Sequence, residues 1–167
     1  MRIRTAAIVI VGFMIAIAQT AECQKRMKYS VVAIEYIGES DKPITPIVIS
    51  DSAAGAEWYR RTVLKRNRSG LTYKHVVTGA LLEKFITEAE RFERTSGSEP
   101  REVSKSVKKA VSVTIITPER KNTFLRDTES AVLLLDRLQQ QAEGDESLRA
   151  DLLHFQNRIR PLRGRLD

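Results

Sequence analysis

The chain has 167 residues, of which 42% are hydrophobic, 29% charged and 6% aromatic. This length suits one domain with its own core, and the hydrophobic content excludes an intrinsically disordered chain. The net charge of +7 falls to +5 if the first 18 residues, which contain Arg2 and Arg4, are removed. An excess of that size permits an anionic partner without requiring one.

The start of the chain has the three parts of a secretory signal peptide. Two arginines lie within the first four residues, and residues 6–18 form an apolar run. Ala16 and Ala18 match the small-residue pattern that signal peptidase cleaves, which predicts a signal peptide over 1–18 and a mature chain from Gln19. The apolar run is shorter than the roughly 20 residues that span a bilayer, so the sequence favours cleavage over a membrane anchor.

The single cysteine, Cys23, lies at the boundary of the signal peptide, and a weaker alternative cleavage site follows it. The domain over 19–167 therefore has no intramolecular disulfide. Lipidation of Cys23 is disfavoured because Glu22 precedes it and Thr20 stands where a large aliphatic residue is expected. An exported domain without disulfides fits the periplasm of a Gram-negative bacterium better than the disulfide-rich class of small extracellular proteins. An extracellular location is the alternative.

The first half of the domain combines β-branched runs with amphipathic ones. The first run carries apolar groups on both alternating faces, which is typical of a central strand, and the second follows it as a hairpin partner. Thr78 is placed to cap the second helix, whose apolar residues recur at intervals of three and four. The expected elements are strands over 28–37 and 44–50, a short helix over 53–64, a strand over 71–77 and a helix over 79–93.

The second half has clear stop and start signals. Residues 95–105 are rich in Ser, Gly, Pro and charges, which predicts an exposed loop. Asp127 and Asp145 are expected to begin two helices, and Gly144 to end the first of them in a left-handed conformation. The expected elements are strands over 109–116 and 123–126, a turn over 118–122, a helix over 127–142, and a helix from Asp145 whose length Pro161 limits.

This order of elements predicts a single α+β domain. We expect a mostly antiparallel sheet of about four to five strands, with about three helices packed on one of its faces. A doubly wound α/β fold is disfavoured, because the early strands lack long crossover helices between them.

Residue types that carry chemistry are scarce. The chain has two histidines, His75 and His154, and these with Cys23 cannot form the usual zinc ligand sets, so no metal and no cofactor is expected. No G-x-S-x-G nucleophile motif and no glycine-rich phosphate loop occurs. No catalytic residue is assigned, although Asp and Glu residues that meet in space leave a hydrolase as an alternative.

The strongest candidate for a binding surface is an aromatic and basic run. Aromatic rings offer broad flat contacts, and arginine forks bind carboxylate or phosphate in a bidentate manner. The competing interpretation makes Trp58 a core anchor and the basic residues a solvated rim. The candidate residues are Trp58, Tyr59, Arg60, Arg61, Lys65, Arg66 and Arg68.

The sequence therefore favours an exported, non-enzymatic binding module for a protein or an anionic envelope component. The alternatives are an envelope hydrolase that uses acidic residues and a purely structural envelope protein. Nucleic acid is disfavoured as a partner by the compartment, and no transmembrane segment is expected in the mature chain.

Overall fold

The computed structural model describes residues 28–38, 40, 43–62, 64, 71–95 and 109–162. The predicted signal peptide, Cys23 and most of the predicted loop over 95–105 lie outside these residues. The elements in chain order are β1 (Val31–Gly38), β2 (Ile47–Ser50), α2 (Ala53–Thr62), β3 (Tyr73–Val76), α3 (Gly79–Thr95), β4 (Lys109–Ile116), β5 (Lys121–Arg126), α4 (Thr128–Gln141), α5 (Glu146–Ile159) and a 3-10 turn (Arg160–Leu162).

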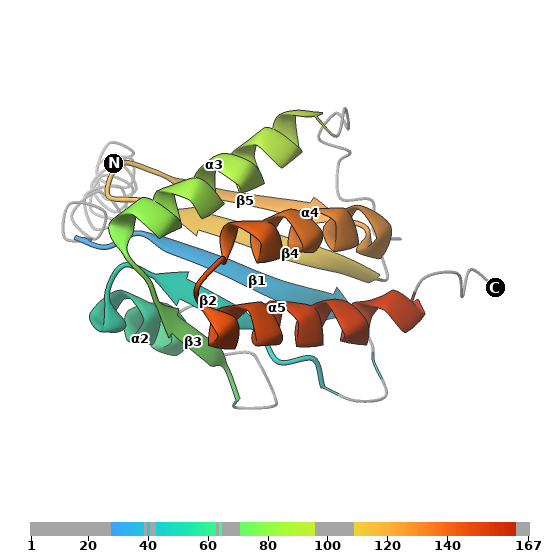
Figure 1. The fold of residues 1–167 in the computed structure, drawn as a ribbon. Coiled ribbons are helices and arrows are strands. Elements are labelled where there is room, and N and C mark those ends of the chain that lie inside the picture. Colours follow the sequence, from blue (N-terminus) through green and yellow to red (C-terminus); the bar gives the residue numbers. More distant parts are fainter. Residues whose placement is uncertain are drawn as a thin grey trace, which may run out of the picture.

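The five strands form one mixed sheet in the order β3-β2-β1-β4-β5 (Figure 1). β1 pairs antiparallel with both β2 and β4, and its register with β4 runs from Val31 opposite Ile116 to Gly38 opposite Lys109. β4 also pairs antiparallel with β5. The predicted α+β class and the central place of the first strand are confirmed.

One pair of strands is parallel and corrects part of the prediction. β2 and β3 pair in parallel, and α2 is the crossover helix that connects them. A parallel pair needs such a connection because the second strand starts at the same end of the sheet as the first, so the chain must first travel back to that end. The short helix expected over 53–64 is therefore present as this crossover connection, and one strand pair is parallel, although the sheet as a whole remains mostly antiparallel.

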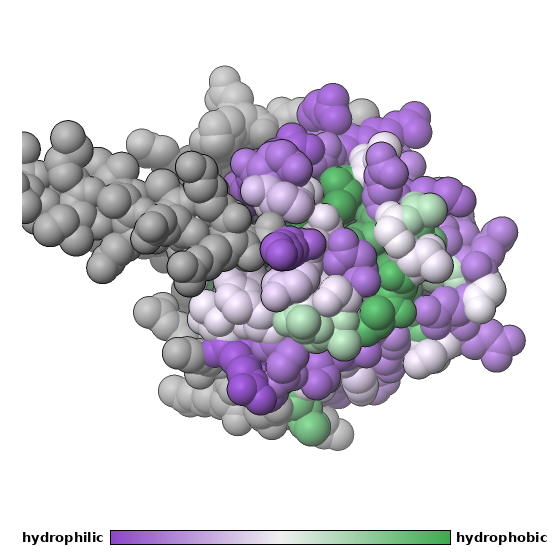
Figure 2. All heavy atoms as spheres, turned by 90° about the vertical axis from the view of Figure 1, so that its left-hand side faces the viewer, coloured by the Kyte–Doolittle hydropathy of each residue, from purple (hydrophilic) through white to green (hydrophobic). Residues whose placement is uncertain are grey.

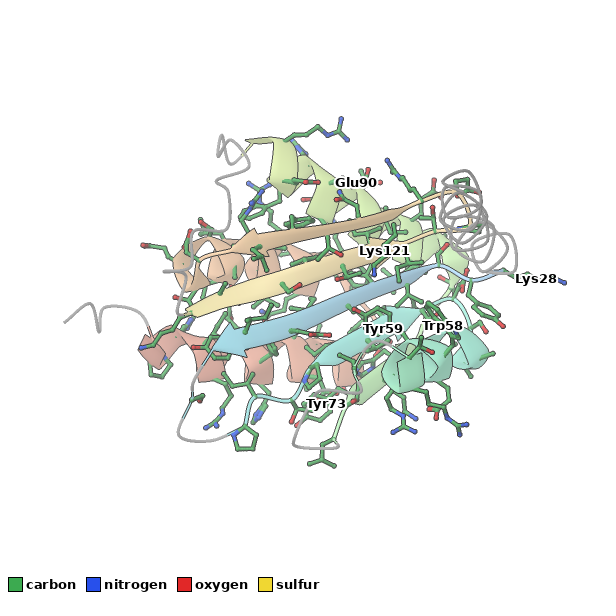
Figure 3. All side chains as sticks on the ribbon, turned by 180° about the vertical axis from the view of Figure 1, so that it is seen from behind. Lys28, Trp58, Tyr59, Tyr73, Glu90 and Lys121 are labelled. Carbon is green, nitrogen blue, oxygen red and sulfur yellow. The ribbon has the colours of Figure 1, made fainter. Side chains whose placement is uncertain are left out.

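The two faces of the sheet have separate hydrophobic cores. Alternation in β1 directs Val32 and Ile34 to the larger core, which is formed with α3, α4 and α5. It directs Val31 and Ala33 to a smaller core that is formed with α2. Figure 3 shows α2 on the opposite side of the sheet from the other three helices. The expectation of helices on one face only was therefore wrong for α2.

The predicted helix starts are confirmed by their hydrogen bonds. The side chain of Asp127 accepts from the backbone N–H of Ser130 at 2.8 Å, and that of Asp145 accepts from the N–H of Leu148 at 3.0 Å. Gly144 has the positive φ of 89° that the end of the preceding helix requires. Caps of this kind each stabilise a helix by about 1 kcal/mol.

The hairpin between β4 and β5 is tighter than expected. The backbone groups of Thr117 and Arg120 exchange two hydrogen bonds, of 2.8 and 3.3 Å. Only Pro118 and Glu119 therefore lie in the turn, and β5 begins at Lys121 instead of residue 123. At the end of the molecule that faces the viewer in Figure 2, hydrophobic side chains occupy a limited area surrounded by hydrophilic ones.

Candidate binding surface on helix α2

Helix α2 is tied to the sheet through the serines and the aspartate that precede it. Ser50 is fully buried, and its hydroxyl donates to the carbonyl of Ser30 at 2.8 Å. The Asp51 carboxylate accepts from the N–H of Ser30, and the Ser52 hydroxyl accepts from the N–H of Ala54 at 3.1 Å. These bonds fix where α2 starts and therefore which of its side chains face the sheet.

Tyr59, and not Trp58, is the core anchor of α2. Tyr59 is only 1% exposed and packs with Ala33 and Val48 on the sheet. Trp58 is partly buried, and its ring meets the Tyr59 ring edge-on at 6.4 Å between centroids. Figure 3 shows Tyr59 between α2 and the sheet. Burial withdraws the Tyr59 ring from the binding surface proposed from the sequence, because a partner cannot contact it.

The hydroxyl of Tyr59 lies near polar groups on the same face of the sheet. Burial raises its pKa to about 12, a hydrogen bond with Thr114 acts in the opposite direction, and the negative charge of Glu35 adds to the increase. The Thr114 hydroxyl also lies 3.1 Å from that of Thr123. Partial burial raises the pKa of Glu35 as well. These groups form a polar row that begins at α2 and crosses to β5.

The stability of the protein should fall steeply in strong alkali because of Tyr59. Its pKa in the folded state, about 12, lies above the ordinary 10, so the contribution of the neutral hydroxyl is complete below pH 10. The contribution is lost as the pH rises through about 12, and its full size is about 2–3 kcal/mol. Urea unfolding from about pH 9 to 12 measures it. Tyr59→Phe should remove this part of the alkaline loss, and an identical pH profile in that variant would contradict the assignment.

The polar side of α2 carries three cations that share one carboxylate. The guanidinium of Arg60 binds Glu57 with Nη2 at 2.6 Å and Nε at 3.1 Å. Arg61 donates to the same carboxylate at 2.7 Å, and Lys74 of β3 donates at 3.1 Å. We call these four residues the Glu57 cluster. The side chain of Arg61 is 72% exposed, that of Lys74 44% and that of Arg60 37%, so the cluster lies at the surface.

The electrostatics of the Glu57 cluster favour anions. Hydrogen bonds from Arg60, Arg61 and Lys74 lower the pKa of Glu57 well below its usual range, and Glu57 in turn raises the pKa of Arg60. Three cations and one permanently ionised carboxylate leave two positive charges in excess. Arg60 and Arg61 also lie in the last turn of α2, where the helix dipole favours cations.

The structure brings together only some of the predicted residues. Arg60 and Arg61 belong to the Glu57 cluster, whereas Trp58 packs against the smaller core with its ring next to Tyr59. Lys65, Arg66 and Arg68 lie outside the described residues. Sequence reasoning missed Glu57 as the centre of the cluster and missed Lys74 altogether. The alternation around Lys74 was visible, but only the parallel pairing of β3 with β2 places it under α2.

The two histidines are held in structural contacts. His75 is 8% exposed, and its Nε2 lies 2.8 Å from the Asp151 carboxylate of α5. The ring of His154 meets the Tyr73 ring edge-on, at 6.1 Å between centroids. These contacts hold β3 against α5. Within the described residues, no three His, Cys, Asp or Glu side chains come together as a metal-binding group.

Comparisons with protein-family models, with curated proteins and with solved structures returned no match. None of the helices in the described part of the chain is long and apolar enough to cross a membrane.

Proposed function

We propose that this protein is an exported, non-enzymatic binding module, and that the Glu57 cluster binds carboxylate groups on the surface of a partner protein. Export rests on the arginines, the apolar run and the small residues at 16 and 18 in the sequence. The binding role rests on the exposed excess of positive charge on α2 and β3.

The observation that carries the choice of ligand is the way Glu57 is held. Its carboxylate receives both nitrogens of the Arg60 fork together with single bonds from Arg61 and Lys74. The cations are therefore already arranged at hydrogen-bonding distance around a carboxylate. Acidic side chains of a partner have the same geometry and charge, and planar arginine forks bind them in a bidentate manner. Trp58, the residue after Glu57 on α2, is only partly buried and offers an aromatic contact of the kind common at protein interfaces.

The proposal predicts that capture of a partner depends on exposed cations of the cluster. A photo-crosslinking amino acid at Thr62, which is exposed at the end of α2, would be used in the exported protein in its native host. Mass spectrometry would identify the captured protein and also show whether the chain begins at Gln19. The double variant Arg61→Gln and Lys74→Gln should reduce the yield of the crosslinked partner about tenfold, as expected for losing about 1.4 kcal/mol of binding free energy.

A matched control separates this effect from net charge. Lys84→Gln with Arg149→Gln removes the same charge from exposed positions on α3 and α5, and it should leave capture unchanged. Capture by the wild type should also weaken at high ionic strength, because exposed charges are screened. Equal capture by the two double variants would rule out the cluster. If no protein partner is captured and the protein binds phosphatidylglycerol vesicles, the ligand of the Glu57 cluster is an anionic lipid surface and not an acidic protein.

A further inference from the structure

A second surface lies at the opposite edge of the sheet from β3, along the outer edge of β5. β5 is the last strand in the sheet order, so among the described strands only β4 pairs with it. An edge strand of this kind presents unpaired backbone groups to any extended chain that approaches it. The β5 edge differs from the Glu57 cluster in location and in the groups that it offers.

The hairpin bonds show which backbone groups of β5 point outward. Thr117 and Arg120 exchange two hydrogen bonds, and such pairs alternate along an antiparallel ladder. The backbone N–H and C=O groups of Asn122, Phe124 and Arg126 therefore point toward β4. The N–H and C=O groups of the intervening residues, Lys121, Thr123 and Leu125, point away from the sheet.

Within the described residues, these outward groups are almost all unpaired. Arg126 Nη1 donates to the carbonyl of Leu125 at 2.9 Å, and in the described part of the chain no other hydrogen bond involves the backbone groups that Lys121, Thr123 and Leu125 direct outward. The side chains of Lys121 and Thr123 are exposed and that of Leu125 is half-buried. Three successive outward positions match the length of a short added strand.

Helix α3 provides a second wall for such a strand. Its C-terminal half extends past β5 in Figures 1 and 3. Asn122 donates to the Glu93 carboxylate at 2.8 Å, and Arg126 Nη2 donates to the Glu93 carbonyl at 3.2 Å, so α3 lies directly over β5. A strand added to β5 would therefore hydrogen-bond to the sheet and pack against α3 at the same time.

The charges around this edge favour an acidic strand over a second copy of the chain. The basic residues around this edge are Arg94, Arg120, Lys121 and Arg126. The acidic residues are Glu90 and Glu93, and both Arg94 and Arg120 bind Glu90. The Nε of Arg126 is buried without an acceptor. Self-pairing of β5 about a two-fold axis at Thr123 would place Arg120 opposite Arg126 and bring two basic sets together, which is unfavourable.

We propose that the outer edge of β5, under α3, binds an extended acidic segment of a partner protein by strand addition. Backbone hydrogen bonds from Lys121, Thr123 and Leu125 hold the segment, and the surrounding cations select its acidic side chains.

The test uses two synthetic peptides whose terminal charges are blocked. In the first, glutamate alternates with valine, and in the second, lysine replaces glutamate. NMR of the isotope-labelled protein would report binding and amide hydrogen exchange. The acidic peptide should slow exchange at Lys121, Thr123 and Leu125 by at least about tenfold, and it should leave the amides that already face β4 unchanged. The lysine peptide should not bind. Protection elsewhere, or binding without protection of these three amides, would overturn the proposal.

Variants of Thr123 isolate the backbone contribution. Thr123→Pro removes an N–H that points away from β4, so no bond of the sheet is lost, and proline is tolerated at such edge positions. This variant should bind the acidic peptide at least about tenfold more weakly, whereas Thr123→Val should bind it as the wild type does. If circular dichroism shows that Thr123→Pro is unfolded, Lys121→Glu, which keeps the backbone, should weaken binding instead. Unchanged affinity in a folded Thr123→Pro variant, or in Lys121→Glu if that variant replaces it, would contradict strand addition.

Two further outcomes are decisive. The glutamine variants of Arg61 and Lys74 should bind the peptide normally, because the Glu57 cluster belongs to a separate surface. In sedimentation experiments, the peptide-free protein should not form a dimer through β5, which would be recognised as a dimer that Thr123→Pro dissociates. Such a dimer would mean that a second copy, and not an acidic partner, occupies the β5 edge.

Discussion

Replacing Phe155 with alanine is expected to lower the free energy of unfolding by about 3–5 kcal/mol. Phe155 is fully buried in α5, in the larger core between the helices and the sheet. Truncation removes most of the ring from this core and leaves a cavity that well-packed neighbours fill only in part. Because a whole domain is stable by about 5–15 kcal/mol, the variant should lose a large share of its stability.

Urea unfolding followed by circular dichroism measures the effect of Phe155→Ala, and the same helix provides its control. Leu153 is 44% exposed on α5, so Leu153→Ala should change the free energy of unfolding by no more than about 0.5 kcal/mol. Similar losses in the two variants would mean that α5 does not enter the larger core through the face that carries Phe155.

Replacing Gly55 with alanine is expected to destabilise the protein by about 2–3 kcal/mol. An added Cβ would lie 2.6 Å from the hydroxyl oxygen of Ser50 and 2.7 Å from Cβ of Tyr29. Neither neighbour can easily move away, because the Ser50 side chain is held by its bond to Ser30 and the Tyr29 contact is the Cβ next to the backbone. Helix α2 would have to shift away from the sheet and weaken the smaller core.

The matched control for Gly55→Ala is Gly79→Ala. Gly79 begins α3, and an added Cβ there meets no atom within 4 Å. The same substitution should therefore leave the protein unchanged or stabilise it by up to about 1 kcal/mol, because it reduces the freedom of the unfolded chain. The midpoints of urea unfolding compare the two variants. Equal midpoints would show that α2 does not approach the sheet as closely as the structure indicates.

The position of α2 also matters for the proposed function. Close packing at Gly55 and burial of Tyr59 on one side of the helix leave Glu57 and Arg61 on the other. A variant that shifts α2 should therefore weaken both stability and partner capture, whereas Arg61→Gln with Lys74→Gln should affect capture alone. Comparing the two variants distinguishes a folded but non-binding surface from a displaced helix.

The sequence by itself determined the elements whose signals are local. Asp127, Asp145 and Gly144 act on backbone groups within a few residues, so the boundaries of α4 and α5 could be predicted from them. The apolar groups on both faces of β1 indicated a central strand. Arg60 and Arg61 were identified as exposed basic candidates because they follow the aromatic pair on a short helix.

Only the tertiary structure decided which elements became neighbours. Alternation shows that a strand is buried on two faces, but not which helix covers each face, and of the described helices it is α2 that covers the second one. Of the two adjacent aromatic residues, the helix start fixed by Ser52 buries Tyr59 and leaves Trp58 partly exposed. Lys74 reaches Glu57 through the parallel pairing of β3 with β2. The free edge of β5 likewise follows from the order of the strands, which pairing between distant segments determines and no local pattern encodes.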